Sequence, residues 1–240
     1  MKLILTQKDF EESGPFRGYY IGEKDVTDYK GDIEIAPNLG SVSFSNSICT
    51  LGDIVIGKGT SIFVDGNVMS DVDITDYSGG NISSGGSIYA FGSIEADRWL
   101  EADGYIEARH EIKTHGPIRS GDYIKAGKDI ISGGWIRSET RIESGMGIKA
   151  SGWIRSGWDI KSAKNIETKD GIKAGWGIIS GDSITSRLSI TASTTIFAGI
   201  SAVGKIPGAQ GIITCRRLLG GATVEHGFLR ETLPNRKEKL

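Results

Sequence analysis

Two histidines, five positions apart, are the residues of this sequence most typical of a metal site. His110 and His115 have the HxxxxH spacing, and imidazole nitrogen is a common zinc ligand. A zinc ion that activates water needs three protein ligands and one open position. The one remaining histidine of the sequence, His226, comes long after this pair. The sequence therefore favours two solvent-exposed histidines at turns over a zinc centre.

Other motifs that could do chemistry lack the context that each requires. Residues 145–150 match the GxGxxA pattern of dinucleotide sites, but no helix is expected after them. Cys215 is followed by two arginines and lacks the arginine, six positions on, that a phosphatase loop needs. Cys49 and Cys215 lie far apart and form no CxxC pair. We therefore expect no catalytic residue, no cofactor and no metal.

Most of the sequence is a repeat of six-residue units, or hexads. From Ile82 to Ile196 every sixth position is isoleucine except for Leu100, and the residue two positions after each is Ala, Ser or Thr. Residues i and i+2 share a face only in an extended chain, so the unit predicts a short β-strand that buries one branched and one small side chain. Strands this short are not stable alone, so successive hexads must wind and stack. The predicted fold is all-β: a single-stranded β-solenoid, or β-helix.

The spacing of the rarer residues predicts three hexads per coil. Trp135 and Trp153 are separated by three hexads, and so are Trp158 and Trp176. A coil of three hexads has three strands and a triangular cross-section. Isoleucines stacked on isoleucines fill its narrow interior, so we expect any ligand to bind outside.

The repeat also predicts how the chain is divided. Residues 1–30 have no hexad register and are interpreted as an N-terminal cap, because the open end of a solenoid exposes strand edges. Residues 31–224 form the predicted solenoid, which is most regular over 82–198. Residues 225–240 form a C-terminal cap or tail. Register slips, read as enlarged turns at corners, fall near 54–56, 74–82 and 199–205.

The residue after each buried isoleucine points outward, and on one face these residues are cationic. Two tryptophans, each directly before a buried isoleucine, share that face. Arginine interleaved with tryptophan suits an anionic partner or a protein interface. The alternative is that the tryptophans cover glycine-rich turns while solvent screens the charges. We call the following six residues the Arg/Trp face: Arg119, Arg137, Arg155, Lys173, Trp135 and Trp153.

Charge and hydropathy narrow the class of protein. Lys and Arg number 28 and Asp and Glu number 30, which leaves a net charge of −2. This balance argues against a broadly basic nucleic-acid binder, although a local patch keeps nucleic acid among the candidate partners. No run of eighteen apolar residues and no signal peptide is present. We therefore expect a cytoplasmic protein without a membrane span.

Several units resemble those of the bactofilins, the polymer-forming bacterial cytoskeletal proteins. The resemblance lies in GDIEI at 31–35, GDIVIGKG at 52–59 and the later Gly-x-Ile-x-Ala units. It implies a triangular, right-handed β-solenoid that self-associates into an oligomer or polymer and binds no nucleotide. This chain is longer than a typical bactofilin core and its repeat is stricter.

A weaker resemblance is to the left-handed hexapeptide-repeat proteins. Many of these are acyltransferases, and some are zinc hydratases with an HxxxxH pair. Their small residue comes two positions before the aliphatic one, whereas here it comes two positions after. We therefore predict a non-enzymatic scaffold that self-associates or presents a rigid binding surface. The alternatives are a binding or inhibitory module that engages a protein or an anionic partner through the Arg/Trp face, and an acyltransferase or zinc hydratase.

Overall fold

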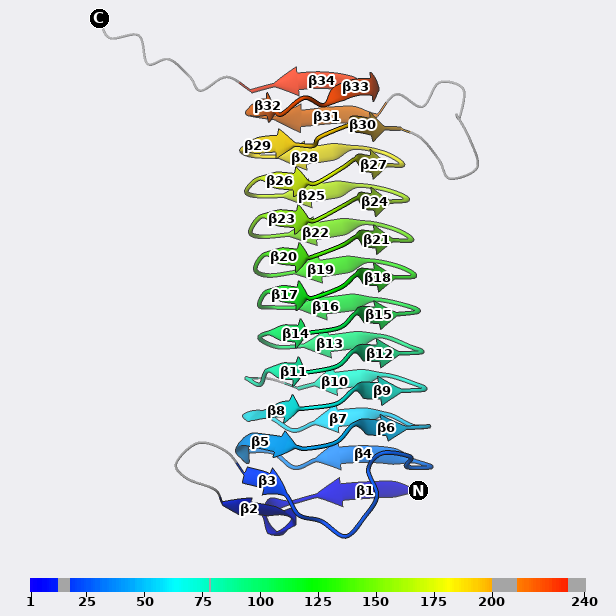
Figure 1. Ribbon diagram of the computed structural model, residues 1–240, viewed down its shortest axis with the longest axis vertical. Helices are drawn as coiled ribbons and strands as arrows, with labels where there is room; N and C mark the ends of the chain where they lie inside the picture. Colours follow the sequence, from blue (N-terminus) through cyan, green and yellow to red (C-terminus); the bar gives the residue numbers. More distant parts are fainter. Residues whose placement is uncertain (13–17, 78, 200–210, 233–240) are drawn as a thin grey trace, which may run out of the picture.

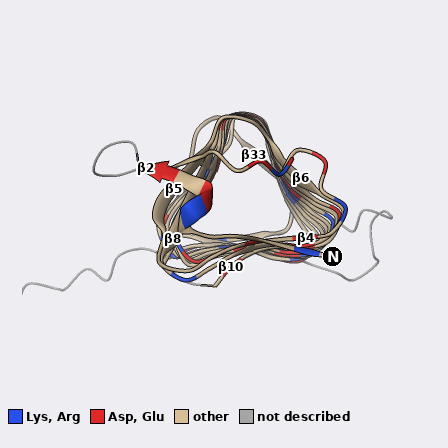
Figure 2. Cartoon of the chain, turned by 90° about the horizontal axis from the view of Figure 1, so that it is seen from below, with Lys and Arg blue, Asp and Glu red and all other residues tan. Residues whose placement is uncertain are grey.

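The computed structural model describes residues 1–12, 18–77, 79–199 and 211–232, and these form a stack of coils (Figure 1). Seen along the stack, the coils have a triangular outline with one sheet on each side (Figure 2). The predicted β-solenoid with three strands per coil is therefore confirmed. Apart from the short 3-10 helix η1 (Gln7–Asp9), the described elements are strands.

Each side of the triangle is one sheet, in which successive coils contribute neighbouring strands. Sheet A consists, in order, of β1 (Lys2–Leu5), β4 (Asp32–Ile35), β7 (Ile54–Ile56), β10 (Ile74–Asp76), β13 (Ile94–Ala96), β16 (Ile112–Thr114), β19 (Ile130–Ser132), β22 (Ile148–Ala150), β25 (Ile166–Thr168), β28 (Ile184–Ser186), β31 (Ile212–Cys215) and β34 (Phe228–Glu231).

Sheet B carries the Arg/Trp face. Its strands are, in order, β2 (Phe10–Glu12), β3 (Gly18–Tyr20), β5 (Gly40–Phe44), β8 (Thr60–Val64), β11 (Ile82–Ser84), β14 (Leu100–Ala102), β17 (Ile118–Ser120), β20 (Ile136–Ser138), β23 (Ile154–Ser156), β26 (Ile172–Ala174), β29 (Ser189–Thr191) and β32 (Arg217–Leu219).

Sheet C is the shortest of the three. It consists of β6 (Ile48–Thr50), β9 (Val68–Ser70), β12 (Ile88–Ala90), β15 (Ile106–Ala108), β18 (Ile124–Ala126), β21 (Ile142–Ser144), β24 (Ile160–Ser162), β27 (Ile178–Ser180), β30 (Thr195–Ala198) and β33 (Thr223–His226). The pairs within the three sheets are parallel, except that β2 and β3 are antiparallel.

The core is the column of branched side chains that the repeat predicts. In the regular coils the isoleucine of each hexad is buried, the residue after it faces outward, and the small residue is buried again. Isoleucine suits this position because β-branched side chains pack well on a pleated surface. At many small positions a serine hydroxyl also hydrogen-bonds the corner of a neighbouring coil: Ser138 Oγ donates to the carbonyl oxygen of Asp122 at 2.6 Å. The narrow core is therefore filled, and the functional site must lie on the surface.

Coil length changes along the stack. Ile54 pairs with Ile74, whereas Ile82 pairs with Leu100, so the earlier coil is longer by two positions. The extra positions lie in the corners that lead from β7 to β8 and from β10 to β11. Gly59 and Gly79 in these corners have φ of 73° and 86°, values that favour glycine because it has no Cβ. The corner between β10 and β11 falls within the predicted slip at 74–82, whereas the corner between β7 and β8 comes directly after the predicted slip at 54–56, which is the strand β7 itself.

The parallel ladders reach beyond the predicted limits of the solenoid. Sheet A begins at β1 and ends at β34, outside the range 31–224 expected from the hexad register. The register missed β1 because Leu3 and Leu5 pair with Ile33 and Ile35, a separation in the chain much longer than one regular coil. Most of the third predicted slip, near 199–205, lies outside the described residues.

Candidate functional site

Four cationic residues of the Arg/Trp face form one column across sheet B. The backbone register places Arg119 beside Arg137, Arg137 beside Arg155, and Arg155 beside Lys173. This register follows from the three-hexad coil, which repeats each outward position on the strand of the next coil. The structure thus brings together side chains that lie far apart in the chain, from position 119 to position 173.

Two of the four cations are already paired with carboxylates. Arg119 forms an ion pair with Glu101, which lies opposite it on β14. Arg137 Nη2 lies 2.6 Å from Glu139 Oε1, just past the end of its own strand. Among the described residues, Arg155 and Lys173 have no ion pair. The positive charge of the column is therefore concentrated at these two residues.

The tryptophans of the face stack in register with the coils. The rings of Trp135 and Trp153 are parallel within 4°, with centroids 4.9 Å apart. This separation matches the spacing of neighbouring strands, so each indole covers the next. Both side chains are half-buried. Trp99 extends the group, with its ring edge-on to Trp135 at 5.9 Å. The sequence interpretation missed Trp99, although it precedes Trp135 by the length of two regular coils.

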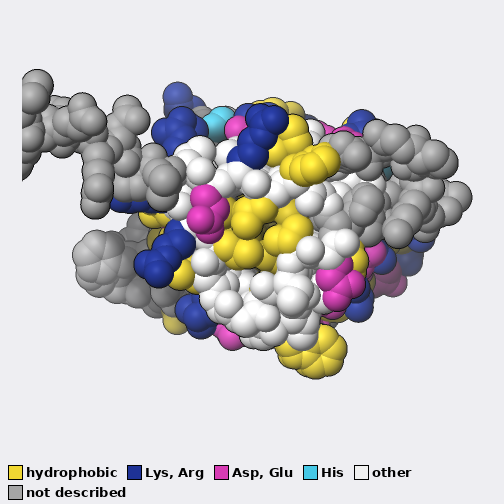
Figure 3. Space-filling model, turned by 90° about the horizontal axis from the view of Figure 1, so that it is seen from above, with side chains coloured by type: hydrophobic (Ala, Val, Ile, Leu, Met, Phe, Trp, Pro, Cys, Tyr) yellow, Lys and Arg dark blue, Asp and Glu magenta, His cyan; other side chains and the backbone are white. Residues whose placement is uncertain are grey.

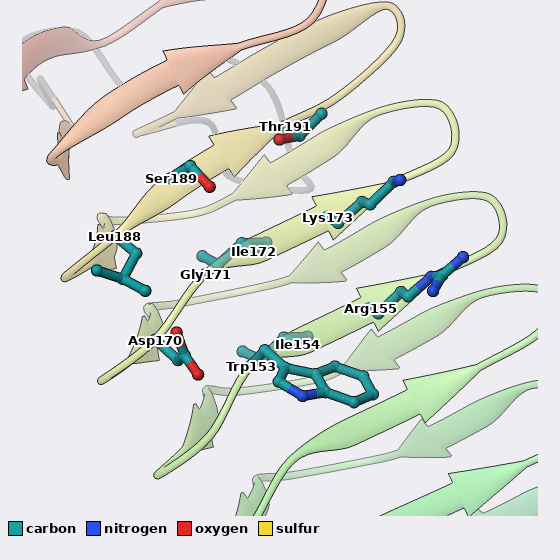
Figure 4. Close-up of a pocket in the computed structure, with 10 residues that line it drawn as sticks. All are labelled: Trp153, Ile154, Arg155, Asp170, Gly171, Ile172, Lys173, Leu188, Ser189 and Thr191. Atoms are coloured by element: carbon teal, nitrogen blue, oxygen red, sulfur yellow. The ribbon is translucent and has the colours of Figure 1, made fainter.

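The tryptophan column stops at Trp153, and a surface hollow begins there. Gly171 takes the equivalent position in the next coil, so that position supplies no side chain to continue the stack on Trp153. The hollow has a volume of about 290 Å³, and Figure 4 shows Trp153, Arg155 and Lys173 around it. Its lining consists of Trp153, Ile154, Arg155, Asp170, Gly171, Ile172, Lys173, Leu188, Ser189 and Thr191. Sequence reasoning named three of these and missed the glycine that creates the space.

A second aromatic column lies on sheet C. Tyr105 and Tyr123 stack with centroids 5.0 Å apart, and Tyr123 Oη donates a hydrogen bond to Glu107 Oε2 at 2.8 Å. Burial raises the pKa of Tyr123 above its usual range, and this hydrogen bond to a carboxylate raises it further. The phenol is therefore held in its neutral form, as a structural donor.

The two histidines of the HxxxxH pair are not joined in a metal site. Both are exposed, and His115 Nδ1 lies 3.0 Å from Asp97 Oδ1. Within the ranges that the structure describes, no group of three or more His, Cys, Asp or Glu side chains could hold a metal ion.

The cysteines are buried or half-buried and remain separate. Burial raises the pKa of the Cys215 thiol, and it does the same for Cys49. A thiol with a raised pKa is a weak nucleophile at neutral pH. This environment does not favour a role for Cys215 in covalent catalysis.

Comparison of the chain with protein-family models, with curated proteins and with solved structures finds no match. Its assignment as a β-solenoid therefore rests on the coils of the structure and not on similarity to a known protein. None of the helices in the described residues has the length and apolar composition needed to cross a membrane.

Proposed function

We propose that this chain is a non-enzymatic cytoplasmic scaffold that self-associates through its C-terminal end. The observation that carries the proposal is that, among the described residues, the three core columns end there in apolar residues that no further strand covers. These residues are Leu218 on β32, Val224 on β33 and Leu229 on β34, which pair with the buried Ile190, Ile196 and Ile213.

The exposure of Leu229 shows that the core is not fully covered at this end. It occupies a core position, yet 40% of its surface is exposed, whereas Ile213 beneath it is fully buried. Figure 3, a view onto this end, shows apolar side chains gathered at its centre. Within the part of the chain that the structure describes, the strands β32, β33 and β34 each pair with a strand on one side only. Uncovered apolar surface beside open strand edges favours association.

The N-terminal end is different because its core is covered. Leu3 and Leu5 are each 1% exposed although they lie on the first strand. The β2–β3 hairpin extends sheet B, and its Phe10 packs edge-on against Phe44 at 5.6 Å. Residues 26–29 cover the edge of sheet C, where Cys49 donates its backbone N–H to the carbonyl oxygen of Val26 at 2.8 Å.

A rod with one covered end and one open end can bury the open end against a second copy. Such an interface uses the same surface on both copies, and it closes at a dimer. The resemblance to bactofilins supports self-association in general. The unequal ends support a closed pair of rods rather than a long polymer.

The test is the mass of the full chain in solution across a range of concentrations. Light scattering after size exclusion should give twice the chain mass of 25.7 kDa. Leu229→Asp should return the protein to a monomer, because it places a charge on the contact surface. Tyr77→Asp, an equally drastic change at an exposed position on the side of the rod, should leave the dimer intact. A strict monomer at all concentrations, or equal effects of the two variants, would contradict the proposal.

A second candidate is a binding or inhibitory module that uses the Arg/Trp face on a protein or an anionic partner, nucleic acid included. It is favoured by one observation, namely that Arg155 and Lys173 adjoin the bare face of Trp153. The two functions are compatible, because the Arg/Trp face lies on the side of the rod and the association surface lies at its end.

A further inference from the structure

The hollow beside Trp153 lies where one more ring would continue the aromatic stack. Trp135 and Trp153 overlap at 4.9 Å, and the position that would continue the column belongs to Gly171. An indole without a partner on one face is a favourable surface for another flat ring. The backbone on either side of Gly171 bounds the space.

The positive charges around the hollow lie together on one side of it. Arg155 and Lys173 project side by side from β23 and β26, and Asp170 and Leu188 lie at the opposite corner (Figure 4). Since neither cation has an ion pair among the described residues, both are available to an anion from solvent. Arginine can offer two parallel donors to a phosphate, and lysine adds a mobile charge.

We propose that this hollow binds a planar aromatic anion of the mononucleotide class. The aromatic ring stacks on Trp153 in the space beside Gly171, and the phosphate is held by Arg155 and Lys173. This inference rests on the second candidate function and names its ligand class. It is independent of self-association at the C-terminal end.

The size of the hollow supports a ligand with a single ring system. About 290 Å³ lies at the lower limit of small-molecule sites, which usually measure about 300–1,000 Å³. The coil after Gly171 carries Ser189 at the same position, so along the stack the space extends over a single coil. Stacking tolerates any base because every base has a π-face, and we therefore assign the class and not one member of it.

The first experiment titrates the full chain with AMP and follows binding by calorimetry. Adenosine supplies the ring without the phosphate, and ribose 5-phosphate supplies the phosphate without the ring. AMP should bind more tightly than either half. Equal binding of AMP and ribose 5-phosphate would contradict the stacking role of Trp153, and absence of AMP binding at millimolar concentration would overturn the proposal.

A matched pair of variants tests directly whether the space at Gly171 is the binding site. Gly171→Trp should fill the space with an indole of the chain itself and abolish AMP binding. A Cβ at Gly171 would lie 3.2 Å from the Ser189 carbonyl oxygen, and a Cβ at Gly177 would lie 3.3 Å from that of Thr195. Gly177→Trp therefore brings a Cβ equally close to a backbone carbonyl oxygen, but in sheet C. It should leave AMP binding unchanged. Equal loss in both variants, with the fold intact by circular dichroism, would contradict the site.

The remaining side chains are tested in the same way. Trp153→Ala should weaken AMP binding about tenfold, the usual scale for loss of one aromatic–base stack. The double variant Arg155→Gln/Lys173→Gln should weaken AMP but not adenosine. Its control, Lys113→Gln/Lys149→Gln, removes two ion-paired cations of sheet A, outside the Arg/Trp face, and should have little effect.

Two further outcomes separate this inference from the functions proposed above. Leu229→Asp should bind AMP as the wild type does, because the hollow lies within one chain. If a single-stranded oligonucleotide binds through Arg155 and Lys173 and AMP does not, the small-molecule assignment is wrong and the broader binding face stands.

Discussion

At the scale of single residues, the charge state of Tyr123 is set by its surroundings. Burial and the hydrogen bond to Glu107 raise its pKa above the ordinary value of 10.0, so the folded state holds the phenolic proton more tightly than the unfolded chain does. The stabilisation is fully present below the ordinary pKa, and it is lost as the pH rises through the pKa of the folded state.

We therefore expect the free energy of unfolding of the wild type to fall more steeply above about pH 10 than that of Tyr123→Phe, which cannot ionise. Equilibrium unfolding in denaturant at several alkaline pH values measures the difference. Absorbance titration should show that Glu107→Gln lowers the pKa of Tyr123, whereas Glu143→Gln leaves it unchanged. Identical pH profiles for wild type and Tyr123→Phe would show that the tyrosine is not coupled to folding.

At the scale of elements, the corners of the coils depend on serines at the small core position. Ser138 Oγ accepts a hydrogen bond from the Thr140 N–H at 3.1 Å. Its hydroxyl proton is shared between the carbonyl oxygens of Asp122 at 2.6 Å and Arg141 at 3.0 Å. The hydroxyl thus links its own corner to that of the preceding coil. Stacked coils are joined by side chains as well as by strand pairing.

Removal of this hydroxyl should loosen the corner. Ser138→Ala should lower the free energy of unfolding by about 1 kcal/mol. The Thr140 N–H loses the nearer of its two acceptors and keeps the Asp122 carbonyl oxygen at 3.2 Å. Ser151→Ala, at an exposed turn position, should change stability by less than about 0.5 kcal/mol. Denaturant unfolding of both variants provides the comparison. Equal losses would contradict a linking role for Ser138.

At the scale of the whole molecule, the two ends of the rod decide how it assembles. Deletion of residues 1–30 would remove β1 and the β2–β3 hairpin and uncover the strands β4, β5 and β6. The rod would then have two open ends, which permits open-ended chains of rods. Light scattering should show species larger than a dimer, and electron microscopy should show elongated assemblies.

The same deletion combined with Leu229→Asp provides the control. With the C-terminal end blocked, only the new N-terminal end can associate, so growth should stop at a dimer. If the double variant still forms long assemblies, the C-terminal end is not the association surface.

The repeat was enough to predict the fold because its period is short and nearly free of interruption. Isoleucine at every sixth position from Ile82, with a small residue two positions later, is compatible with stacked three-strand coils and with little else. The outward column from Arg119 to Lys173 followed from the same arithmetic. The ends were less predictable, since β1 and β34 join sheet A through segments that do not keep the three-hexad spacing.

Which surface residues are free to bind a partner depends on contacts that form only in the folded chain. Whether a cation is paired depends on its rotamer, which the repeat does not specify: Arg119 pairs across the sheet with Glu101, whereas Arg137 pairs with Glu139 just past the end of its own strand. The hollow at Gly171 exists because a residue without a side chain follows two stacked indoles in space, one coil after Trp153 in the chain. The repeat determines the backbone position of each side chain and the face on which it lies. Contacts between side chains of different coils determine which of them remain accessible to a partner.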